Sequence, residues 1–173
     1  MRSPTKEISD KASFRAMALT VLFTLSWLEA MVPFGVPGVK FGFSNLVIIT
    51  CLTVYGFQEA LVMAVLKIFM STILFNGFSS FWFTAAGTLA SCLSMALAVR
   101  YYRKDVLSLI GVSAIGGFCH ITVQYIVAAC TLYTTSVFGM YPMAALLTLL
   151  TSVILGFLAD KITKQLVNSS YDY

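Results

Sequence analysis

The chain has 173 residues, of which 59% are hydrophobic and only 10% are charged, and its formal net charge is +4. Soluble globular domains carry about 25% charged residues, so this composition excludes a soluble domain and indicates an integral membrane protein. The basic residues cluster at the edges of apolar segments, which is a pattern of membrane topology and gives no support to nucleic-acid binding.

Six apolar stretches, separated by short breaks, predict six transmembrane helices and therefore an all-α integral membrane protein. We expect one membrane domain over residues 1–173: a cytoplasmic N-terminal segment at 1–13, a six-helix bundle at 14–160 and a cytoplasmic tail at 161–173. The second helix is short for a hydrocarbon core about 30 Å thick, so we expect it to lie partly at the interface. The predicted helices are 14–33, 43–56, 58–76, 80–100, 107–133 and 137–160.

The distribution of Lys and Arg predicts the orientation of these helices. With the N-terminus inside, nine of the 11 basic residues would face the cytoplasm, and the remaining two are Lys40 in the first outer connection and Lys67 within the membrane. Cytoplasmic loops of membrane proteins carry this excess of positive charge. We therefore expect both termini in the cytoplasm and a multi-pass membrane protein.

Lys67 is the most informative residue, because it lies in the middle of an apolar stretch that runs from Ala60 to Phe75. A charge near the bilayer midplane costs about 3 kcal/mol on insertion scales. Such a residue either binds an anionic group of a ligand or a neighbouring carboxylate, or it extends to the interface or forms a structural pair. The sequence leaves both interpretations open.

Three further polar residues are candidates for a ligand site. His120 and Gln124 are four residues apart, so they share one face of the fifth predicted helix. Asn45 begins the second helix beside Ser44, where it could equally be a helix cap. Glu29 could pair with Lys40 and thereby fix the connection rich in Pro and Gly at 33–40.

Several absences argue against an enzyme. The sequence contains no GxxxxGK[ST] segment, so it has no P-loop for ATP. It also lacks an aspartate-rich motif for magnesium and diphosphate, and one histidine with four scattered cysteines offers no metal-ligand spacing. We predict no catalytic residue, no metal site and no cofactor.

The chain resembles the Gx transporter family, also labelled heptaprenyl diphosphate synthase component I, over about residues 12–160. The most specific part of the resemblance is PGVKFGFSN at 37–45, with the pattern PGxKxGxxN. It is supported by VYGFQEA at 54–60, LK at 66–67 and LFNGFSS at 74–80. That family in turn looks like the substrate-binding S components of energy-coupling factor (ECF) transporters.

The resemblance implies a six-helix protein that captures a small molecule from outside, with its first loop over a site built mainly from the outer halves of helices four to six. It implies as partners an ECF transmembrane coupling subunit and two cytoplasmic ATPases. Helix one of S components commonly carries an AxxxA motif that docks on the coupling subunit, and Ala12 and Ala16 match it. Small residues at this spacing otherwise serve packing within a chain.

We therefore expect an S-component-like protein for uptake of a small, largely apolar molecule: a quinone precursor, an isoprenoid or a flavin-like ring. Its polar groups would be Lys67, His120, Gln124, Asn45 and Lys40, with Lys67 and Lys40 facing a carboxylate, phosphate or enolate. Aromatic residues would contribute to the apolar lining, although we expect most of their rings to serve packing or to anchor the protein at the membrane interface. They are Phe78, Phe81, Trp82, Phe118, Tyr125 and Tyr133.

Two alternatives remain. The chain could be a quinone-binding membrane subunit of a flavin-linked, extracellular electron-transfer system, with Lys67 and His120 bonded to quinone oxygens. It could also be an assembly subunit without a ligand, in which case Lys67 and His120 would be replaceable by apolar residues.

Overall fold

Helices account for nearly all of the chain in the computed structural model, which describes residues 4–31, 40, 42–76 and 81–171. The side chains described are those of 13–31, 40, 42–74 and 81–166. No strand occurs within these ranges. The elements are α1 (Pro4–Met31), α2 (Asn45–Val54), α3 (Phe57–Met70), the π-helical turn η1 (Ser71–Asn76), α4 (Phe81–Tyr102), α5 (Leu109–Leu132), the short 3-10 helix η3 (Ser136–Met140) and α6 (Tyr141–Tyr171).

The fold class is confirmed, whereas the expected number of six transmembrane helices needs a correction. Five helical segments in the described part are long and apolar enough to cross a membrane, and α2 is not one of them. Its 10 residues rise about 15 Å, which is half of a hydrocarbon core about 30 Å thick. The protein is therefore a multi-pass membrane protein of five long helices and one half-length helix.

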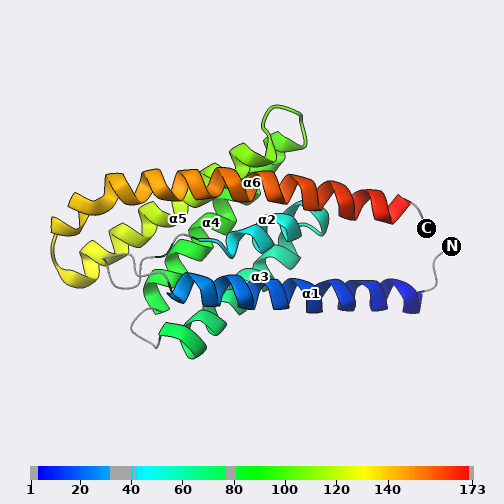
Figure 1. Cartoon of the computed structure of the whole chain (residues 1–173), viewed down its shortest axis with the longest axis horizontal. Helices are drawn as coiled ribbons and strands as arrows, with labels where there is room; N and C mark the ends of the chain where they lie inside the picture. The colour runs from blue at the N-terminus through cyan, green and yellow to red at the C-terminus, as the bar shows by residue number, and fades with distance from the viewer. Residues whose placement is uncertain (1–3, 32–39, 41, 77–80, 172–173) are drawn as a thin grey trace.

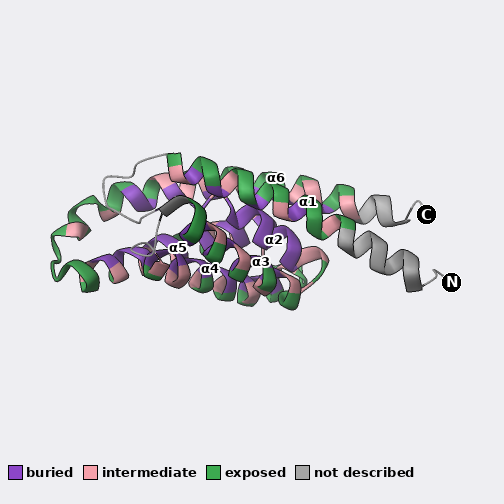
Figure 2. Cartoon of the chain, turned by 90° about the horizontal axis from the view of Figure 1, so that it is seen from below, coloured by how far each residue is buried: buried purple, intermediate pink, exposed green. Residues whose placement is uncertain are grey.

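The half-length helix lies inside the bundle. Eight of its residues, from Asn45 to Leu52, are buried. Figure 1 shows α2 beginning near the middle of the long axis and running toward the end where both termini lie, while Figure 2 shows it buried along most of its length. The α2 helix packs against α3, α4, α5 and α6 and, less extensively, against α1. The expectation that it lies partly at the membrane interface stays a prediction.

The first and the last helix of the chain, α1 and α6, are both longer than expected. The α1 helix begins at Pro4 and α6 continues to Tyr171, whereas the sequence predicted a bundle limited to 14–160. Hydrophobicity marks where a helix enters the membrane, but helix propensity decides where it ends. Neither 5–13 nor 161–171 contains Pro or Gly, so nothing in those segments interrupts the helix.

At the end of the bundle where both termini lie, side-chain contacts join α1 to α3 and α2 to α6. Arg15 of α1 donates from Nε to Glu59 of α3 at 3.0 Å, and a second bond from its Nη2 completes an ion pair. The hydroxyls of Thr53 and Thr163 lie 3.2 Å apart between the end of α2 and α6. The α2–α3 turn itself depends on Gly56, whose φ of +94° favours glycine. The basic residues of this end match the side predicted to be cytoplasmic.

Candidate functional site

A buried polar centre lies where α2 begins. We use this name for Glu29, Lys40, Ser44, Asn45, Lys67, Ser71, Ser91, His120 and Gln124, each of which is buried. These side chains come from α1, the residues before α2, α2 itself, α3, η1, α4 and α5. Residues far apart in the sequence therefore meet at one level of the bundle.

Lys67 forms the central contact. Its side chain is only 1% exposed, and Nζ donates to Asn45 Oδ1 at 2.9 Å. Asn45 Nδ2 in turn donates to Ser91 Oγ at 3.0 Å. The amide of Asn45 thus links α3 to α4 and does not cap α2, so the interpretation of Asn45 as a cap is wrong. Lys67 also does not extend to the interface, because its ammonium group is held inside the protein.

Lys40 is a second buried lysine, although the sequence indicated only that it lies in the first connection between helices. It is 6% exposed, and its Nζ donates to Ser71 Oγ at 2.5 Å. Its backbone N–H donates to Gln124 Oε1 at 3.0 Å. The half-length α2 explains this placement, because the chain must reach the middle of the bundle before α2 can begin.

Glu29 provides the negative charge of the polar centre. Its two carboxylate oxygens accept from the Ser44 backbone N–H at 3.1 Å and from the Ser44 hydroxyl at 3.0 Å. This carboxylate fixes the segment that precedes α2, as expected, but it does so through Ser44 and not through a direct bond to Lys40. Its effect on Lys40 is a longer-range charge interaction.

The charges of the polar centre do not balance. Between Ala16 and Gln58 the only charged residues are Glu29 and Lys40, between Ala60 and Val99 the only one is Lys67, and 106–159 contains none. With both ammonium groups protonated, one carboxylate faces two cations. Buried charges are normally paired or hydrogen-bonded, so this site is suited to one additional negative charge.

His120 and Gln124 lie beside this charged group on α5. Neither ring nitrogen of His120, nor Gln124 Nε2, has a hydrogen-bond partner among the described residues. Buried polar atoms are satisfied in most proteins, and each unmade bond costs about 1–3 kcal/mol. Unpartnered groups at the level of two buried cations indicate a place where a ligand could supply the partners.

Two glycines let the backbone approach these side chains. Gly42 has a φ of +82°, and a Cβ there would lie 2.8 Å from Asn45 Nδ2 and 3.6 Å from His120 Cδ2. A Cβ at Gly87 of α4 would lie 2.7 Å from Gln124 Cγ and 3.1 Å from His120 Cε1. Any larger residue at either position would enter the space next to His120.

The structure thus brings together all five residues that the sequence suggested for ligand binding: Lys67, His120, Gln124, Asn45 and Lys40. Their role in binding stays a prediction. The sequence analysis did not predict that Ser71 and Ser91 belong to the polar centre, although the helical spacing of polar residues could have indicated both. Ser71 follows Lys67 by four residues, and Thr84, Thr88 and Ser91 follow one face of α4.

Most of the described aromatic residues that the sequence suggested lie at the surface, and one lies in the core. Tyr125 is fully buried between α4, α5 and α6, where it packs with Phe83 and Ile121. Trp82, Phe118 and Tyr133 are exposed, as expected for side chains at a lipid-facing surface or its edge. Phe81 is half-buried, and Phe78, like residues 32–39 of the first connection, lies outside the described residues.

The docking residues are only partly described. Ala16 lies on α1 and is exposed, whereas the side chain of Ala12 lies outside the described part of the chain. Beside Ala16, an apolar groove of about 250 Å³ runs between α1, α2 and α6, with Met17, Val21 and Leu166 in its walls. An exposed small residue next to an apolar groove is compatible with close approach of another helix.

The fold and the polar centre define a multi-pass helical membrane protein with a buried cluster of charged and polar side chains. The chain matches the family described as heptaprenyl diphosphate synthase component I over residues 17–162, and it belongs to that family. The family comprises membrane proteins that resemble ECF S components, and the synthase component in its name is the non-catalytic one. Neither a curated protein nor a solved structure gives a significant match.

Two carboxylates that differ in burial, Glu29 and Glu59, give a test of the polar centre. We expect Glu29→Ala to lower the free energy of unfolding by about 3 kcal/mol, because it leaves the Ser44 donors without their acceptor and removes the nearby negative charge from two buried lysines. The matched control is Glu59→Ala, which removes the more exposed pair with Arg15 and should cost much less. Thermal unfolding in detergent measures both, and equal losses would contradict the assigned role of Glu29.

Proposed function

We propose that this protein is the substrate-binding component of an ATP-driven uptake system in a bacterial membrane, and that its substrate is a small, largely apolar molecule with one negative charge. The observation that carries this proposal is the make-up of the polar centre, where two buried lysines, Lys40 and Lys67, lie together with a single carboxylate, that of Glu29. A carboxylate, phosphate or enolate would neutralise the excess charge and accept hydrogen bonds from Lys67 or Lys40.

The remaining polar atoms fit the other end of such a ligand. His120 and Gln124 have donors without partners in the described structure, and a few polar groups that fix orientation are typical of small-molecule pockets. Apolar contact is available from the cluster around Tyr125, which adjoins Gln124 in the sequence and packs against the rings of Phe138 and Tyr141. A quinone precursor, an isoprenoid or a flavin-like ring has this combination of properties.

The energy for uptake would come from partners. The chain has no P-loop, and membership of an S-component-like family supports a coupling subunit with two ATPases. We propose that the coupling subunit docks on the face of α1 that carries Ala12 and Ala16, beside the groove between α1, α2 and α6. Lys67, His120, Gln124, Asn45 and Lys40 would then bind the substrate, and ATP hydrolysis by the partners would drive its release inward.

A second candidate function follows from His120. A neutral imidazole can donate to one quinone oxygen while Lys67 donates to the other, which would suit a quinone-binding subunit of a flavin-linked electron-transfer system. Gentle purification separates the two proposals. Uptake predicts co-purification with ATPases, whereas electron transfer predicts a coloured sample that contains flavin- or haem-binding partners.

The charge of the substrate can be measured directly. We expect native mass spectrometry of the protein, purified from its own membrane, to show one bound small molecule that extraction identifies as a monoanion at neutral pH. Lys67→Met should reduce its occupancy at least tenfold, because a desolvated charge-assisted hydrogen bond is lost. Lys161→Gln, which removes an exposed cation from α6, is the control. Retention of the molecule by Lys67→Met, or an uncharged or cationic molecule, would refute the anionic substrate.

The docking face has its own test. Ala16→Leu should weaken recovery of the ATPase-bearing complex at least several-fold, because the larger side chain prevents close helix packing. It should leave the bound small molecule in place. The control is Thr24→Leu, a similar increase in apolar size at an exposed position two turns further along α1. Equal recovery of the complex for Ala16→Leu and the parent would rule out docking at this face.

A further inference from the structure

A basic hollow lies at the opposite end of the bundle from the connections α3–α4 and α5–α6. It has a volume of about 560 Å³ and lies between the end of α2, the start of α3 and the last turns of α4. Its apolar walls include Leu52, Phe57, Leu93 and Leu97, and its basic residues are Arg100 and Arg103. A neighbouring hollow of about 440 Å³ shares Leu97 and Arg100 and adds Tyr101 and Lys104.

The two arginines have no ion-pair partner among the described residues, and both are exposed. Arg15 and Lys164, by contrast, are each paired with a carboxylate at the same end of the protein. The only acidic residue adjacent in sequence is Asp105, in the turn that follows. The positive-inside rule accounts for basic charge at this end, but it requires neither a hollow nor arginine in place of lysine. Arginine is the preferred residue for bidentate binding of phosphate.

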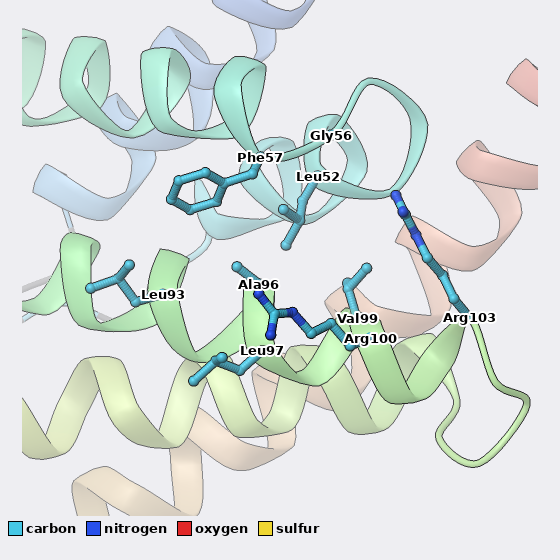
Figure 3. Close-up of a pocket in the computed structure, with 9 residues that line it drawn as sticks. All are labelled: Leu52, Gly56, Phe57, Leu93, Ala96, Leu97, Val99, Arg100 and Arg103. Carbon is cyan, nitrogen blue, oxygen red and sulfur yellow. The ribbon is translucent and has the colours of Figure 1, made fainter.

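Polar and apolar parts of the hollow are arranged by membrane depth. Leu93 and Leu97 are exposed and precede Arg103 by 10 and 6 residues on α4, which corresponds to about 9–15 Å along the helix axis. Figure 3 shows Phe57 and Leu93 on one side of the hollow, Arg103 on the other, and the Arg100 side chain between them. The guanidinium groups therefore lie near the membrane edge, and the exposed leucines lie deeper.

We propose that this hollow binds one anionic phospholipid of the inner leaflet, with its phosphate against Arg100 and Arg103 and an acyl chain along Leu93, Leu97 and Phe57. Basic pockets between helices on the cytoplasmic side bind such headgroups. The separation of basic and apolar walls matches a molecule that has a phosphate at the interface and a hydrocarbon chain pointing to the bilayer centre. A soluble phosphate would use the arginines but not the exposed leucines. This site is independent of the polar centre and of the proposed uptake.

The test uses the full chain in detergent with an equimolar mixture of phosphatidylglycerol and phosphatidylcholine, and native mass spectrometry to count retained lipids. The protein should retain one phosphatidylglycerol in preference to phosphatidylcholine. The double variant Arg100→Gln, Arg103→Gln should reduce this retention at least about tenfold. Ala96→Trp, which fills the hollow without a change in charge, should reduce it as well.

The matched control is Lys161→Gln with Lys164→Gln, which removes two positive charges from the same end of the protein and should retain the lipid. Equal loss in this control would mean that net charge alone attracts the lipid, and would overturn the site. Equal retention of the two lipids by the parent, or unchanged retention by Ala96→Trp, would also overturn it. Displacement by glycerol phosphate at the same concentration would assign the hollow to a soluble phosphate and refute the lipid.

Discussion

The hydrogen bond from Lys67 to Asn45 is the contact around which the polar centre is arranged. It holds an ammonium group in the middle of a membrane helix, where an unpaired charge would be costly. It requires that α2 begin at the same depth as Lys67, because Asn45 is the first residue of α2. A helix that starts at mid-depth can be only about half as long as its neighbours, and α2 has this length.

A half-length helix in turn brings irregular backbone into the bundle. Such backbone is tolerated at membrane depth only where protein surrounds it, and here Glu29, Ser71 and Gln124 bond to the residues just before α2. The π-helical turn at Ser71, four residues after Lys67, belongs to the same arrangement. Such turns occur often at functional sites. The irregular backbone, the π-helical turn and the excess of lysine over carboxylate all lie where we propose that substrate binds.

The helical class, the approximate limits of four of the six helices and the five polar residues of the site could be predicted from the sequence. The length of an apolar stretch locates a membrane helix. A polar residue within such a stretch faces the protein interior, so Lys67, His120 and Gln124 could be predicted to be buried. The depth of α2 was not visible, because hydropathy cannot distinguish a short span from a half-span. The burial of Lys40 follows from that depth, so it could not be predicted from hydropathy either. The aromatic residues could not be assigned to a pocket from the sequence, since apolar rings face lipid as readily as they face a pocket.

The central claim is that Lys67 is kept for a ligand and not for stability. The most direct measurement is thermal unfolding of the ligand-free protein and of the double variant Lys67→Met, Asn45→Leu, which replaces both partners of the buried bond by apolar side chains. The account predicts that the double variant is at least as stable as the parent, since buried polar pairs replaced in this way are often neutral or stabilising by about 1–4 kcal/mol. A loss of stability as large as that of Glu29→Ala would contradict it and would make Lys67 a structural residue.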